Sequence, residues 1–176
     1  GLMCSPDQHA GYPGSYGDGR IGDKPYLVID TGGFEPIRTE GIVKEMTGQA
    51  QLAITESDAV LFLVDGRAGL TPQDQRIAQN LRESGKKTYL VVNKAEGLTE
   101  TAKAEFYELA LGEPYTISAA HGEGVKALMD LVLEPFPTEK EIDEEEDFKH
   151  KIKVAIAGRP NAGKSTLMSV LFGLYQ

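Results

Sequence analysis

Hydrophobic residues in this chain gather in short continuous runs, separated by polar and glycine-containing stretches. The run at 59–64 is apolar at every position, which is typical of a parallel strand covered on both faces. The other runs are β-prone and end at residues that favour loops. The predicted strands lie at 26–29, 59–64, 88–92, 115–117 and 151–157.

Helices are predicted between these strands. Thr71 and Pro72 fit a helix start, with Thr as the N-cap and Pro at the first helical position, and Gly85 fits its end. Strands that alternate with helices of about ten or more residues favour right-handed crossovers and a mostly parallel sheet with flanking helices. The fold class is therefore predicted to be α/β. The predicted helices lie at about 41–56, 72–84, 99–111 and 124–133, with a last one from 164.

Two stretches lack a hydrophobic period. Residues 1–24 are rich in glycine, tyrosine, proline and aspartate, which predicts an irregular N-terminal segment. The stretch 137–150 begins with a run that holds seven acidic residues against one lysine, so it carries most of the net charge of −9. We interpret it as a solvated, self-repelling linker; the alternative is an acidic docking tail for a basic partner.

Composition narrows the class of protein. The hydrophobic fraction of 40% suits a soluble globular protein, and no run of about 18 apolar residues could span a bilayer. The first residues do not resemble a secretory signal, so a cytoplasmic location is expected. Because the net charge is −9, a broad basic face for nucleic acid is not expected. We therefore expect neither a membrane nor sequence-specific binding of DNA.

The strongest motif follows the last predicted strand and opens the last predicted helix. Residues 158–165 fit the pattern G-x-x-x-x-G-K-[ST] of a phosphate-binding P-loop, whose backbone N–H groups and helix N-terminus favour phosphate oxygens. Lys164 is expected to reach the β- and γ-phosphates, and Ser165 to ligate Mg²⁺. A chance match in an ordinary strand-loop-helix is the alternative. The candidate residues are Gly158, Asn161, Ala162, Gly163, Lys164, Ser165 and Thr166.

Three weaker motifs also follow predicted strands. Asp30 and Gly33 fit D-x-x-G, in which the Asp holds Mg²⁺ through water and the Gly amide meets the γ-phosphate, so Gly33 joins Lys164 as a candidate catalytic residue. Alone, this motif is more often a simple turn. The other two motifs are a possible guanine-reading loop and the end of the next strand, whose amides could meet the guanine O6 atom. Their candidate residues are Asn93, Lys94 and Glu96, then Ser118, Ala119 and Ala120.

The guanine-reading interpretation depends on Glu96. A carboxylate can accept hydrogen bonds from the N1–H and N2–H₂ groups of guanine, a pattern that adenine does not offer. By itself, an N-K-x-E sequence is a common surface loop. Its position after a strand is what favours a ligand site, because open α/β sheets bind ligands at the carboxyl ends of their strands.

Taken together, these motifs make the chain similar to G domains of the P-loop NTPase class, and it most resembles the Der (EngA) family of bacterial tandem GTPases. The resemblance covers roughly 12–168 and is carried by the stretches 19–34, 62–72 and 153–161. It implies GTP or GDP with Mg²⁺ at the motifs above, and a ribosomal particle of the 50S type as a partner. Glu96 stands where the family more often has Asp.

The chain departs from that family in its order of motifs. Nothing before residue 25 resembles a P-loop strand, and the switch threonine that would ligate Mg²⁺ is missing. We therefore expect an internal fragment, with an incomplete first G domain at 25–136 and the P-loop strand and first helix of a second at 151–176. We favour a permuted packing in which 151–157 fills the gap between 26–29 and 59–64. The alternative is a P-loop that lies apart from the sheet.

These observations leave three hypotheses about function. The first is a GTP-binding protein and GTPase that acts in assembly of the large ribosomal subunit, with slow or absent hydrolysis in this chain. The second is a catalytically inactive fragment that acts only as a binding module. The third is an ATP-using P-loop enzyme, which leaves the Asn93–Glu96 motif unexplained.

Overall fold

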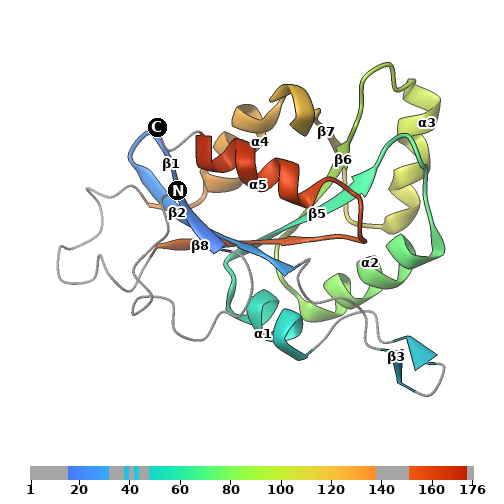
Figure 1. The fold of residues 1–176 in the computed structure, drawn as a ribbon, viewed down its shortest axis with the longest axis horizontal. Helices are drawn as coiled ribbons and strands as arrows, with labels where there is room; N and C mark the ends of the chain where they lie inside the picture. Colours follow the sequence, from blue (N-terminus) through green and yellow to red (C-terminus); the bar gives the residue numbers. More distant parts are fainter. Residues whose placement is uncertain (1–15, 32–37, 40–41, 44–47, 138–150, 174–176) are drawn as a thin grey trace.

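The computed structural model describes residues 16–31, 38–39, 42–43, 48–137 and 151–173 (Figure 1). Within this part of the chain, six strands form one sheet in the order β1-β2-β8-β5-β6-β7, and β3 pairs with β4 separately. The strands are β1 Tyr16–Ile21, β2 Lys24–Asp30, β3 Arg38–Thr39, β4 Ile42–Val43, β5 Ala59–Asp65, β6 Thr88–Asn93, β7 Tyr115–Thr116 and β8 Ile152–Ala157.

The last strand of the chain lies inside the sheet. Val154 of β8 is opposite Val28 of β2 on one side and Ala59 of β5 on the other, and both pairings are parallel. Figure 1 shows β8 running between the blue β2 and the teal β5. The predicted permuted packing is therefore confirmed, as is the α/β class with a mostly parallel sheet; only β1 pairs antiparallel in this sheet, as the outer strand of a hairpin with β2.

Helices cover both faces of the sheet. In Figure 1, α4 and α5 lie on one side, and α1 and α2 lie on the other. The helical segments are α1 Gly48–Glu56, α2 Pro72–Ser84, α3 Glu100–Ala104, the 3₁₀ turn η3 Glu105–Leu109, the 3₁₀ turn η4 Ala119–His121, α4 Val125–Leu133 and α5 Lys164–Gly173.

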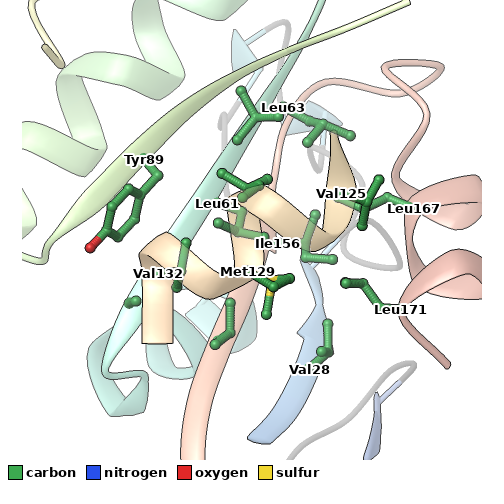
Figure 2. Packing of buried hydrophobic residues seen from close by; sticks show 14 of the residues in the cluster. Val28, Leu61, Leu63, Tyr89, Val125, Met129, Val132, Ile156, Leu167 and Leu171 are labelled. Atoms are coloured by element: carbon green, nitrogen blue, oxygen red, sulfur yellow. The ribbon is translucent and has the colours of Figure 1, made fainter. Parts of the chain in front are cut away.

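The apolar run of β5 divides its side chains between two cores, because successive residues of a strand point to opposite faces. Leu61 and Leu63 join a cluster with α4 and α5, whereas Phe62 and Val64 pack with α2 and η3. Figure 2 shows the first cluster, in which Met129 of α4 lies among side chains of the strands and α5. Both faces of the central strands are thus buried, as the continuous apolar runs predict.

Helix α2 begins and ends where the sequence predicts. Thr71 accepts a hydrogen bond from the Asp74 amide, and the Asp74 side chain accepts one from the Thr71 amide, which completes a capping box. At the other end, Gly85 adopts a left-handed conformation with φ of 71°.

The expectation of an irregular segment at 1–24 is wrong for β1. Its two buried positions are glycines, so the strand shows no hydrophobic alternation in the sequence. A Cβ atom at Gly17 would lie 2.2 Å from the Phe172 ring, and one at Gly19 would lie 2.2 Å from the Tyr26 ring. These two aromatic rings occupy the space that side chains of β1 would normally fill, so the strand needs glycine at both positions. In the sequence alone, such glycines suggest turns rather than a strand.

Two helix boundaries also differ from the prediction. The helix predicted at 41–56 begins only at Gly48, and residues 42–43 pair as a strand instead. The helix predicted at 99–111 is α-helical only to Ala104 and continues as a 3₁₀ turn to Leu109, before Ala110 turns left-handed with φ of 54°. Residues 1–15 and 138–150 lie outside the described residues. Among the described helices, none combines the length and apolarity needed to cross a bilayer.

Candidate functional site

The P-loop connects β8 to α5 and curls around the ammonium group of its own lysine. Lys164 Nζ donates to the carbonyl oxygens of Gly158 at 2.7 Å and Arg159 at 2.8 Å. Asn161 has a left-handed φ of 70°, which turns the loop back toward the helix. Ala162 is buried, whereas Ser165 and Thr166 are exposed in the first turn of α5. The loop therefore has the curled form that a phosphate cradle requires.

Asn93 joins the P-loop to the loop after β7. Its Nδ2 atom donates to the carbonyl of Ala162 at 2.9 Å, and its Oδ1 atom accepts from the amide of Ala119 at 3.0 Å. The side chain is 3% exposed, so these hydrogen bonds form away from water. Gly163 makes room for it: with φ of 102°, a Cβ atom there would lie 2.1 Å from Asn93 Nδ2. Three predicted motifs are thus brought together by one amide side chain.

Lys94 makes a second link to the P-loop. Its Nζ atom donates to the Asn161 carbonyl at 3.1 Å and to Asp65 Oδ2 at 2.9 Å. Asp65 ends β5, and its other oxygen accepts from the amides of Arg67 and Ala68. Burial acts to raise the pKa of Asp65, but the hydrogen bonds from Lys94 and the two amides outweigh it and hold the pKa below its usual value.

Glu96 is held by a hydroxyl and by two basic side chains. Ser118 Oγ donates to Glu96 Oε1, Arg67 lies 3.5 Å from its Oε2 atom, and His121 lies 3.6 Å from its Oε1 atom. The hydrogen bond from Ser118 is the main cause that lowers the pKa of Glu96, and the charges of Arg67 and His121 act in the same direction. The carboxylate is therefore ionised and acceptor-only at neutral pH. A pocket of about 170 Å³ adjoins it, lined in part by Ser118 and Glu123.

Asp30 ends β2 next to the strand that leads into the P-loop. It is 8% exposed and is paired in register with Ile156. Thr31 fixes this edge, because its hydroxyl donates to the Ile156 carbonyl at 2.7 Å. Gly33, the other predicted residue of this motif, lies outside the described residues.

The structure thus places the P-loop, Asp30, the Asn93–Glu96 loop and the Ser118–Ala120 loop at the carboxyl ends of neighbouring parallel strands. Ala120 is exposed at this edge, beside the buried Ala119. Sequence reasoning missed four further side chains in the same region. Asp65 could have been found from the sequence, because it follows an apolar run in the same way as Asp30 does. The missed residues are Asp65, Arg67, Asp74 and His121.

The sequence of this chain is similar to those of known proteins. A family model described as "50S ribosome-binding GTPase" matches residues 14–94 and 153–176. Curated relatives named GTPase Der are 61% identical over 159 residues in Chromobacterium violaceum, 53% over 161 residues in Cupriavidus metallidurans and 56% over 159 residues in Azoarcus sp.. Each alignment covers 90% of this chain but only 33%, 36% and 36% of the respective relative, so the chain spans about a third of their length.

Proposed function

Because the chain belongs to the family of 50S ribosome-binding GTPases, we propose that it binds GTP and GDP, with Mg²⁺, where the P-loop meets the loops after β2, β6 and β7. The observation that carries this proposal is the double hydrogen bond of Asn93, to Ala162 in the P-loop and to Ala119 in the loop after β7. A phosphate-binding element and a base-reading element that share one buried side chain can contact the two ends of the same nucleotide.

The phosphate end fits the residues present. Lys164 is 7% exposed and its ammonium group already lies inside the curled loop, satisfied by two carbonyl oxygens. A bound phosphate would compete for that ammonium group and for the amides at the start of α5, where the helix dipole also favours negative charge. Lys164 and, by its motif, Gly33 are the groups we assign to the transferred phosphate.

The residues beside the P-loop also fit a Mg²⁺ ion. Ser165 lies in the first turn of α5 and Asp30 ends the neighbouring strand β2, so a hydroxyl and a carboxylate flank the P-loop. Both are oxygen ligands of the kind that Mg²⁺ prefers. When bound, Mg²⁺ would bridge phosphate oxygens and neutralise their charge.

The base end favours guanine. The hydrogen bond from Ser118 lowers the pKa of Glu96 and so favours its ionised form. An ionised carboxylate accepts hydrogen bonds without donating any. Guanine presents two adjacent donors to such a group and adenine does not, so the selectivity of the site is assigned to Glu96. Lys94, Asn161 and the amides of Ala119 and Ala120 complete the surroundings of the base and sugar.

At the level of the whole protein, we propose a cytoplasmic GTPase that acts on a 50S-type ribosomal particle during its assembly. The support is the description of the matching family and the name of the relatives. In domain terms, residues 25–136 would be part of a first G domain, residues 137–150 a linker, and residues 151–176 the P-loop strand and first helix of a second.

The test is a titration of the chain with a fluorescent GDP analogue in Mg²⁺, followed by competition with unlabelled GTP and ATP. We expect saturable binding that GTP displaces and ATP does not. Lys164→Ala should abolish it, while Lys126→Ala, on the exposed face of α4, should not change it. Displacement by ATP would favour an ATP-using enzyme, and no saturable binding would favour an inactive binding module.

A Glu96→Gln variant tests base selectivity separately. It keeps the size of the side chain but replaces one acceptor oxygen by a donor, so the preference for GTP over ATP should fall while binding of the phosphates is retained. A variant that keeps the full preference would remove Glu96 from the role of guanine reader.

A further inference from the structure

A buried ion pair connects the P-loop to the start of α2. Arg159 Nε lies 3.5 Å from Asp74 Oδ1, and the two side chains are 16% and 0% exposed. The opposite oxygen of Asp74 accepts the amide of Thr71 at 3.0 Å, which fixes the carboxylate to the helix cap. The two oxygens of Asp74 therefore have different contacts: one caps its own helix and the other faces the P-loop.

Helix capping alone does not explain this arrangement. Among the described residues, neither Asp74 Oδ1 nor the Nε and Nη2 atoms of Arg159 have a hydrogen-bond partner, although all three are buried. A buried charge is costly unless an opposite charge compensates it, so each of these groups depends on the other. Burial raises the pKa of Asp74, while the hydrogen bonds of Thr71 and the charge of Arg159 act to lower it.

The segment between β5 and α2 has a second buried carboxylate, at its start. Asp65, at the end of β5, pairs with Lys94, and Lys94 donates to the Asn161 carbonyl in the P-loop. The connection between β5 and α2 thus has a buried carboxylate at each end. Each carboxylate faces a basic side chain that belongs to the P-loop or contacts it.

We propose that Asp74 is a positioning residue for the P-loop: through Arg159 it fixes the conformation of residues 158–163, so that α2 contributes to nucleotide binding without touching the nucleotide. This inference deepens the proposed function and rests on it. Its physical basis is that a buried guanidinium group is costly unless an opposite charge lies beside it, and Asp74 supplies that charge. Without the carboxylate, the guanidinium group must move toward water, and the loop must move with it.

The test compares Asp74→Asn, Arg159→Gln and the double variant with the wild-type chain. Asparagine keeps an acceptor oxygen for the Thr71 amide, removes the charge and replaces the oxygen that faces Arg159 by an NH₂ donor. The matched control is Asp130→Asn, which makes the same change at an exposed position of α4. One measurement is amide hydrogen exchange of the P-loop without added nucleotide, and the other is the Kd of the fluorescent GDP analogue.

We expect Asp74→Asn and Arg159→Gln each to speed P-loop exchange and to weaken GDP binding by about tenfold, while exchange in the middle of α2 stays unchanged. The double variant should be no weaker than the worse single variant, since both changes remove the same contact. Arg159→Lys, which retains the positive charge, should recover part of the loss. The control should behave as wild type.

Exchange and Kd values that stay within about twofold of wild type in a folded Asp74→Asn chain would overturn the inference, as would single effects that multiply in the double variant. If Asp74→Asn does not fold, the two Arg159 variants decide: equal P-loop exchange and equal Kd values in Arg159→Gln and Arg159→Lys would overturn the inference. If the wild-type chain binds no GDP, the proposed function fails, and P-loop exchange still decides whether Asp74 positions the loop.

Discussion

Asn93 Nδ2 donates to the carbonyl oxygen of Ala162 across 69 positions of the chain. Asn93 ends β6 and Ala162 lies in the loop that follows β8, and β5 separates these two strands in the sheet. Asn93 is opposite Asp65 at the end of β5, and its side chain reaches past that strand end to the P-loop. This contact exists only because β8 fills the sheet, so the integrity of the site and the position of β8 are linked.

Asn93→Ala should destabilise the chain by about 2–4 kcal/mol, because it leaves the Ala119 amide and the Ala162 carbonyl buried without their partner. Urea denaturation measures the change in the free energy of unfolding. The control is Asn80→Ala on α2, where we expect a change within about 0.5 kcal/mol. Equal effects of the two substitutions would show that the buried amide links are not formed in solution.

Gly163→Ala should be more damaging than Gly85→Ala, although both glycines adopt left-handed backbone conformations. At Gly85 a Cβ atom meets nothing within 4 Å, so only the backbone conformation is penalised, by about 1 kcal/mol. At Gly163 the Cβ atom would lie 2.1 Å from Asn93 Nδ2 and would displace that side chain. We expect a loss above about 2 kcal/mol together with loss of GDP binding. Similar losses for both variants would contradict the close packing at Gly163.

The central strands were predictable from the sequence because short, β-prone apolar runs that end at loop-forming residues are typical of parallel strands buried on both faces. Helix α2 was predictable for a different reason, since Thr71, Pro72 and Gly85 are local signals that act within a few residues. β1 was not predictable in this way. Its buried positions are Gly17 and Gly19, and the rings that cover them are those of Phe172 in α5 and of Tyr26 in the paired strand β2.

In the candidate site too, local patterns were predictable from the sequence and contacts between distant residues were not. Its P-loop and its Asn93–Glu96 loop are local patterns, and the sequence predicts both. The contact between Arg159 and Asp74 has no local signature, because it depends on β8 lying beside β5 and on where α2 begins. The role of Ser118 in holding Glu96 was likewise hidden, since it requires the spacing of two strand ends that only the sheet defines.

Stability at low pH should depend on Asp65. Its pKa is lowered in the folded chain, so its ionised form stabilises the fold fully above the unfolded value near 3.8 and less as the pH falls through the folded value. The difference in unfolding free energy between wild type and Asp65→Asn should therefore be largest near neutral pH and shrink below pH 3.8. Urea denaturation across this range measures it. A difference that stays constant down to about pH 2 would show that Lys94 and the backbone amides do not hold this carboxylate.

The position of β8 in solution can be tested at Ile156. This side chain is fully buried in the cluster with α4 and α5, and the residue pairs with Asp30 on one side and Leu61 on the other. Ile156→Ala should cost about 2–5 kcal/mol, the usual penalty for such a truncation in a packed core. The control is Leu52→Ala on α1, where the side chain is 48% exposed and the change should stay within about 0.5 kcal/mol.

The way in which the Ile156→Ala chain unfolds is as informative as the size of the effect. Since β8 contacts β2 and β5 at once, its weakening should lower the stability of the whole sheet in a single transition. Far-UV circular dichroism and tyrosine fluorescence should report the same midpoint, because Tyr26 and Tyr89 lie in the same cluster and the chain has no tryptophan. If 152–157 were instead outside the sheet, Ile156→Ala would change stability no more than Leu52→Ala does. The P-loop would then have no fixed relation to Asn93, and neither the shared nucleotide site nor the Arg159–Asp74 contact could form.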